Sequence, residues 1–81
     1  MEANSTSFST DSFFLACYLI YESLPLIGVD RTNPRRVAFF FEESEKREFL
    51  TNQFLSYQAK VEPNKFATAQ KNLKQIIYNN T

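Results

Sequence analysis

Three arginines stand close together in the segment RTNPRRVAFFFEE, residues 31–43, beside three consecutive phenylalanines. Arg31, Arg35 and Arg36 suit phosphate binding, because guanidinium donors match the oxygens of a phosphate group. A phenylalanine that points outward next to them can stack on a nucleotide base. These residue types therefore indicate nucleic-acid binding as one function. The expected contacts are Arg31, Arg35, Arg36, Phe40, Lys71 and Lys74.

The overall charge argues against this function. The chain has nine basic and nine acidic residues, so its formal net charge is zero, whereas a strongly basic domain is typical of nucleic-acid binders. The charges are unevenly placed, because residues 1–30 contain four acids and no base and residues 31–36 contain three arginines and no acid. Glu42 and Glu43 follow within three residues of Phe40, where they would repel phosphate groups.

The sequence offers little for catalysis. It contains no histidine, one cysteine and one glycine, which removes the commonest general base, a zinc site and a glycine-rich phosphate loop. A cluster of acids at residues 42–48 has the residue type for acid–base work or for a hard cation. Acids in a first helical turn more commonly complement the helix dipole. We predict a protein that is not an enzyme, with no catalytic residue, metal, cofactor or small-molecule substrate.

Cys17 lies in the apolar run FFLACYLIY. A lone cysteine in such a run is expected to be a small buried hydrophobe, with a reactive thiol or an intermolecular disulfide as the alternative. The run is far shorter than the roughly 20 residues that cross a bilayer, and no basic residue precedes it as in a secretory signal. We therefore expect a soluble, cytoplasmic protein.

The elements that position these residues follow from local patterns. Residues 1–9 are small and polar and predict a flexible tail, which leaves a single domain over residues 10–78. Thr10 or Asp11 is expected to cap a first helix. This helix is expected to run to about Ser23, where a following proline restricts the residue before it.

The first helix is apolar on most of its sides. Phe14, Tyr18 and Tyr21 extend its apolar face around the cylinder, and a helix of this kind is usually buried on most sides. The rest of so short a chain is not expected to cover it, so these three aromatics predict an exposed interaction patch for a second copy or a larger protein. The alternative is that all three fill the core of the monomer.

Two β-rich segments follow, joined by a polar turn that contains Asn33 and Pro34. They predict a two-stranded antiparallel hairpin. On its second strand, the period of two places Phe39 and Phe41 on one face together with Val37, and Phe40 on the other. We therefore expect Phe39, and not Phe40, in the core.

Two further helices complete the predicted domain. Ser44 is expected to cap a helix over residues 45–58, and Pro63 is expected to start the last helix. The predicted fold is α+β with the order α-β-β-α-α, in which the hairpin packs on the helices. The apolar face of the last helix comprises Phe66, Ala69, Leu73, Ile76 and Ile77.

This order resembles a family of short bacterial and phage domains of unknown function. The family has a T/S-D-x-F-x-L-A helix start, a hairpin that ends in F-x-F-E, and a final F-x-x-A-x-x-x-L-K-x-x-I helix. The corresponding positions here run from Thr10 to Ala16, from Phe39 to Glu42 and from Phe66 to Ile77. The resemblance implies the fold order and supplies no catalytic residue. From the residues, a protein-interaction module, as a homo-oligomer or an accessory subunit, is the first functional hypothesis, and nucleic-acid binding is the second.

Overall fold

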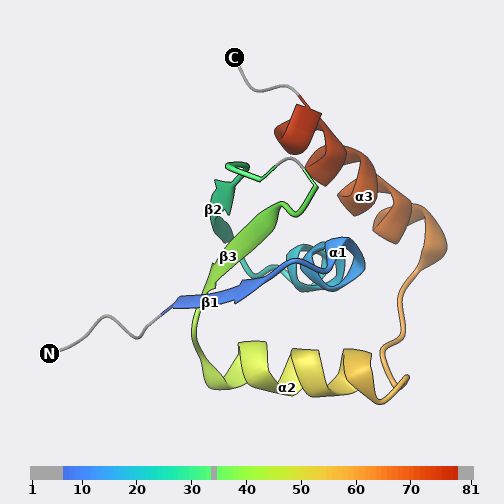
Figure 1. The fold of residues 1–81 in the computed structure, drawn as a ribbon. Coiled ribbons are helices and arrows are strands. Elements are labelled where there is room, and N and C mark those ends of the chain that lie inside the picture. Colours follow the sequence, from blue (N-terminus) through green and yellow to red (C-terminus); the bar gives the residue numbers. More distant parts are fainter. Residues whose placement is uncertain (1–6, 34, 79–81) are drawn as a thin grey trace, which may run out of the picture.

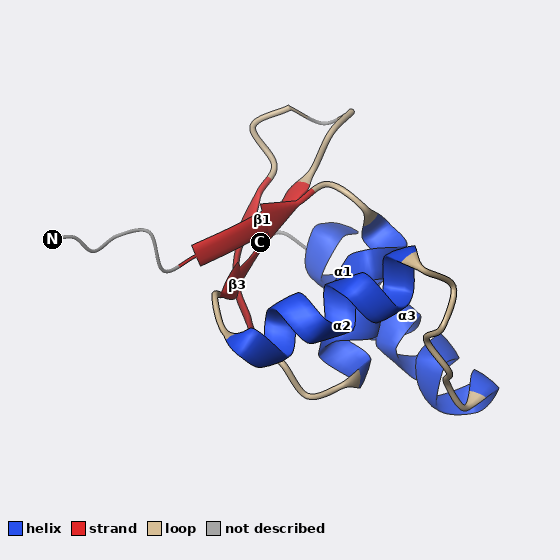
Figure 2. Ribbon diagram, turned by 90° about the horizontal axis from the view of Figure 1, so that it is seen from below, coloured by secondary structure: helices blue, strands red, loops and turns tan. Residues whose placement is uncertain are grey.

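The computed structural model describes residues 7–33 and 35–78. These residues form one antiparallel sheet, with the strand order β1-β3-β2, and three helices. The strands lie on one side of the molecule and the helices on the other (Figure 2). The elements are β1 (Ser7–Thr10), α1 (Phe13–Tyr21), β2 (Leu26–Asp30), β3 (Ala38–Glu42), α2 (Glu45–Leu55) and α3 (Pro63–Tyr78).

The fold is α+β, but the predicted order was wrong by one element. Residues 7–9, expected in a flexible tail, begin strand β1, which pairs with β3 and makes the sheet three-stranded. Phe8 lies opposite Phe41 in this pairing and packs against the core cluster. Phe8 is the one apolar residue of this strand. A single apolar residue cannot show the alternation by which a strand is predicted from sequence. Residues 1–6 of the predicted tail lie outside the described residues.

Strands β2 and β3 pair antiparallel as predicted, although within a three-stranded sheet and not as a two-stranded hairpin. The predicted faces of β3 are confirmed. Phe39 and Phe41 are buried in the core cluster together with Leu73. Val37, Phe66 and Ile77 are partly buried and pack against this cluster. Phe40 is half-buried on the opposite face of the sheet, where Ser9 and Gly28 are its cross-strand partners.

Helix α1 lies at the centre of the molecule, with the sheet, α2 and α3 around it (Figure 1). The residues Leu15, Ala16, Cys17, Tyr18 and Leu19 are all buried. The expected cap was wrong: the backbone N–H of Leu15 donates to the Ser12 hydroxyl at 3.2 Å, and Thr10 belongs to β1. The helix therefore starts later and ends earlier than predicted.

Helices α2 and α3 begin where the sequence predicts. The Ser44 hydroxyl accepts from the backbone N–H of Arg47 at 3.0 Å, and Pro63 is the first residue of α3. Helix α2 ends at Leu55, three residues before the predicted end. On α3, Leu73 is buried as expected, whereas Ile76, predicted on the apolar face, is exposed.

Two helices end with the same unusual backbone turn. Ser23 after α1 and Tyr57 after α2 have positive φ angles of 76° and 62°. In each turn the next residue donates its N–H back to the helix, as Gln58 does to the Gln53 carbonyl at 2.9 Å. Glycine is strongly preferred at this position, because a Cβ atom is strained in the left-handed conformation.

Glycine at either position should therefore stabilise the protein. We expect Ser23→Gly and Tyr57→Gly each to raise the free energy of unfolding by about 1 kcal/mol, measured by urea denaturation. Tyr57→Ala keeps the Cβ atom and serves as the control without this gain. A Tyr57→Gly protein less stable than Tyr57→Ala would contradict the assigned strain.

Candidate functional site

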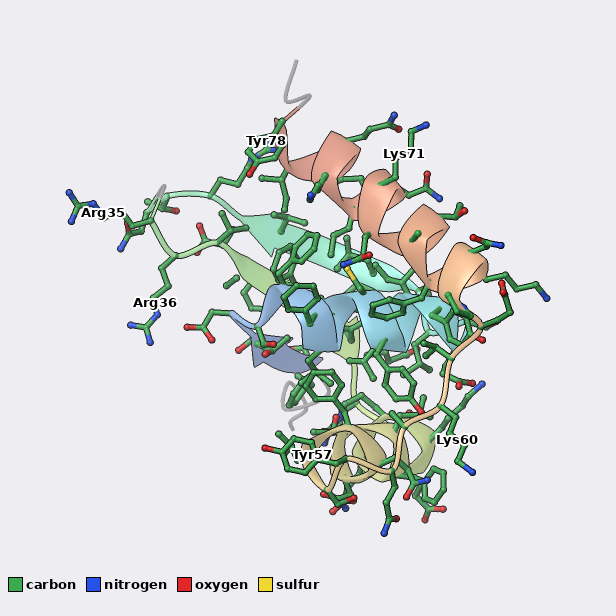
Figure 3. All side chains as sticks on the ribbon, turned by 90° about the vertical axis from the view of Figure 1, so that its right-hand side faces the viewer. Arg35, Arg36, Tyr57, Lys60, Lys71 and Tyr78 are labelled. Carbon is green, nitrogen blue, oxygen red and sulfur yellow. The ribbon has the colours of Figure 1, made fainter. Side chains whose placement is uncertain are left out.

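Basic side chains from two distant segments gather on one side of the molecule. The segment between β2 and β3 carries Arg35 and Arg36, and the last turns of α3 carry Lys74 together with the aromatic Tyr78. Figure 3 shows both arginines projecting from the loop and Tyr78 at the end of α3. Between them lies a groove of about 630 Å³. We call it the basic groove; it is lined by Asp11, Phe13, Asn33, Arg35, Arg36, Val37, Phe39, Lys74, Ile77 and Tyr78.

The basic groove continues along the outer face of α3. This open helix surface shares Lys74 and Tyr78 with the groove and adds Lys71. Lys71 and Lys74 are three residues apart, so they lie on one face of the helix. Of the nucleic-acid contacts expected from the sequence, the structure thus brings Arg35, Arg36 and Lys74 together in the groove. Lys71 lies beside Lys74 on α3 and does not line the groove with the arginines.

Arg31 has a different place from the other arginines. Its Nη1 donates to the backbone carbonyls of Ile76 at 2.9 Å and Ile77 at 3.2 Å. These carbonyls lie at the C-terminus of α3, where a helix lacks internal donors and a cation is favourable. Arg31 therefore fastens the loop to α3 and positions the two walls of the groove.

Arg36 is paired with the acid of the groove. Its Nε donates to Oδ2 of Asp11 at 2.6 Å, and the two side chains are 73% and 48% exposed. This hydrogen bond and the positive charge of Arg36 lower the pKa of the Asp11 carboxyl. Asp11 is consequently ionised at neutral pH.

The loop itself is held by short-range hydrogen bonds. The backbone N–H of Arg35 donates to Oδ1 of Asn33 at 3.0 Å, and the Thr32 backbone and hydroxyl both donate to Asp30. These bonds lower the pKa of the Asp30 carboxyl. Arg35 is exposed, and it forms no ion pair with the residues that the structure describes.

Phe40, the expected stacking residue, does not belong to this site. It lies on the face of the sheet that carries no helix, whereas the basic groove involves Phe39 on the inner face. The aromatic side chain that accompanies the cations is Tyr78, which is 78% exposed. Tyr78 was not among the contacts expected from the sequence.

The predicted aromatic patch on α1 was wrong. Phe14 is 54% exposed, but Tyr18 is only 4% exposed and packs against Phe54 of α2, with ring centroids 6.0 Å apart. Tyr21 is half-buried against Phe66, and its hydroxyl accepts from the backbone N–H of Glu62 at 2.9 Å. The chain does cover the helix, because α2 and the start of α3 fold across it.

Cys17 is fully buried, as expected for a small hydrophobe. Burial raises the pKa of its thiol to about 11, although the positive charge of Lys74 acts weakly in the opposite direction. The thiol is therefore protonated at neutral pH and lacks the thiolate that reacts.

The acidic cluster at residues 42–48 has a structural role in part. Arg47 is buried, and its Nε and Nη2 donate to the two oxygens of Glu43 at 2.7 and 2.8 Å. The guanidinium carbon also lies 3.9 Å from the ring centroid of Phe8, a cation–π contact that joins α2 to β1. No group of three possible metal ligands occurs among residues 7–33 and 35–78.

A family model described as "Domain of unknown function (DUF5659)" matches residues 5–79. The chain belongs to this family. The assignment confirms the resemblance to small domains of unknown function, and the family's description states no activity. No curated protein and no solved structure gives a significant match. None of the helices described for this family member is long and apolar enough to span a membrane.

The position of Arg31 predicts its effect on stability. We expect Arg31→Ala to lower the free energy of unfolding by about 1 kcal/mol, because it removes charge-assisted bonds to the end of α3. Urea denaturation measures this loss, and hydrogen exchange should show faster exchange in the last turn of α3. Arg35→Ala removes the same charge from the same loop and should leave both measurements unchanged. Equal midpoints for the two variants would contradict the role of Arg31.

Proposed function

We propose that this chain is a non-enzymatic binding module that holds single-stranded nucleic acid in the basic groove. The proposal rests on the grouping of Arg35, Arg36, Lys74 and Tyr78 in the basic groove, with Lys71 on the adjoining face of α3. Single-strand binders combine a positively charged groove that follows the phosphates with aromatic side chains on which bases stack.

The phosphate contacts are assigned to the exposed cations. Arg35, Lys71 and Lys74 form no ion pairs with described residues, and Arg36 is mostly exposed despite its contact with Asp11. Side chains of this kind reach phosphate groups at small desolvation cost. Because they neutralise phosphates and release counterions, the binding they produce weakens steeply with salt.

The base contact is assigned to Tyr78. Its ring is largely exposed at the end of α3, next to Lys74. A base stacked on an aromatic side chain contributes about 1–3 kcal/mol and requires an unpaired base, which favours single strands over duplexes. The neutral net charge limits long-range attraction, so we expect modest affinity that is clearest at low salt.

Two substitutions in the groove test this function. We expect Tyr78→Ala to weaken binding of a labelled oligothymidine of about 12 nucleotides roughly tenfold, through the loss of stacking. Lys74→Gln should weaken binding and reduce the slope of log affinity against log salt by about 0.7, the value for one phosphate contact on a single strand. Fluorescence anisotropy between about 50 and 200 mM salt measures both effects.

Matched controls lie at the opposite end of the molecule. Tyr57 is 96% exposed and Lys60 is exposed, and Figure 3 shows both beside the end of α2, away from the groove. Tyr57→Ala and Lys60→Gln should bind like the wild type. The proposal fails if the wild type does not bind at low salt, or if the control variants lose as much affinity as the groove variants.

A second candidate function is protein interaction, as a homo-oligomer or an accessory subunit. It is favoured by large apolar side chains that are exposed on and after α2, namely Phe49, Leu55 and Tyr57. Phe14 of the original patch is also exposed. Aromatic side chains are enriched at the centres of interfaces. Tyr57 has a strained backbone conformation, and strained residues are often found at functional sites. A cytoplasmic location remains a prediction for both functions.

Light scattering tests the self-associating form of this candidate. A homo-oligomer should give a mass above 9.5 kDa at high micromolar concentration, and Tyr57→Glu should return the mass to that of the monomer. If the wild type is a monomer at this concentration, self-association is excluded. If the wild type is an oligomer and Tyr57→Glu has the same mass, Tyr57 does not lie in the interface.

A further inference from the structure

We infer that Asp11 is an internal competitor for the nucleic-acid phosphate at Arg36, so that the ligand binds by displacing it. The inference rests on the proposed function of the basic groove. Oδ2 of Asp11 lies 2.6 Å from Nε of Arg36, and both residues line the groove. The carboxylate therefore occupies a donor of the guanidinium that a phosphate oxygen would use.

A phosphate group can replace the Asp11 carboxylate at Arg36, because the two anions bind a guanidinium in the same way. Carboxylate and phosphate groups both present oxygen atoms to the guanidinium donors, with similar geometry. The Asp11–Arg36 pair is solvent-exposed on both sides, and exposed ion pairs contribute little to stability. A phosphate can therefore replace the carboxylate without unfolding any part of the chain.

The fold positions Asp11 next to Arg36, and Asp11 does not cap helix α1. Asp11 follows Thr10, which lies opposite Phe39 in the pairing of β1 with β3, and Arg36 lies just before β3. The N-cap of α1 is Ser12, so Asp11 is not needed to start the helix. Asp11→Asn should leave the fold intact while it frees Arg36 from its charged partner.

The inference predicts that Asp11→Asn binds more tightly than the wild type. We expect a gain in affinity for the oligothymidine of up to about fivefold, the upper end of what one competing exposed ion pair contributes. The slope of log affinity against log salt should steepen by up to about 0.7, because Arg36 then exchanges only mobile counterions for phosphate. Fluorescence anisotropy gives both quantities.

Two controls separate this mechanism from a general effect of charge. Glu22→Gln changes the net charge by the same amount at the other end of α1 and should leave affinity and slope close to those of the wild type. In an Arg36→Gln background, Asp11→Asn should bring little or no gain, because the group it competes for is absent.

The outcomes distinguish the inference from the function on which it rests. If the wild type and Asp11→Asn both fail to bind, the proposed function is overturned and the inference with it. If the wild type binds but Asp11→Asn gains no more than Glu22→Gln, the function stands and the inference is overturned. Weaker binding by Asp11→Asn would make Asp11 a ligand contact and would also overturn the inference.

Discussion

The burial of helix α1 is the constraint on which the rest of the structure depends. Five consecutive residues of this helix, Leu15 to Leu19, are buried, so it must be covered on nearly every side. A chain of 81 residues can bury only about 60–65% of the surface that it exposes when unfolded. Each remaining element is consequently used as a cover: the sheet packs on one side, α2 on another and α3 on a third (Figure 1).

The candidate site is a consequence of this arrangement. To cover α1, α3 runs across it until its last turn meets the loop between β2 and β3. Arg31 closes this contact with hydrogen bonds to carbonyls 45 and 46 residues away. The groove is therefore built from segments that are remote in sequence. Its two walls are joined by the side chain of Arg31. Arginines that look alike in the sequence thus divide into a positioning residue, Arg31, and the groove residues Arg35 and Arg36.

A chain without net charge can still present a basic surface, because its acids lie mostly outside the groove and two of them are engaged elsewhere. Glu43 is held by the buried Arg47, and Asp30 accepts from Thr32 within its own loop. Asp11 is the acid that remains in the groove among the described lining residues. The local balance of charge, and not the total, is what a bound anion experiences within a Debye length of about 10 Å.

The sequence by itself determined the elements whose signals are local. The alternation of β3 predicted Phe39 in the core, and the caps at Ser44 and Pro63 predicted where α2 and α3 begin. Only the tertiary structure decided whether Tyr18 is exposed and which aromatic side chain joins the arginines. Both depend on how helices distant in sequence cross, because burial and proximity are properties of the packed chain and not of any short segment. Strand β1 also depended on the tertiary structure, since its four residues are stable only when they pair with the edge of β3.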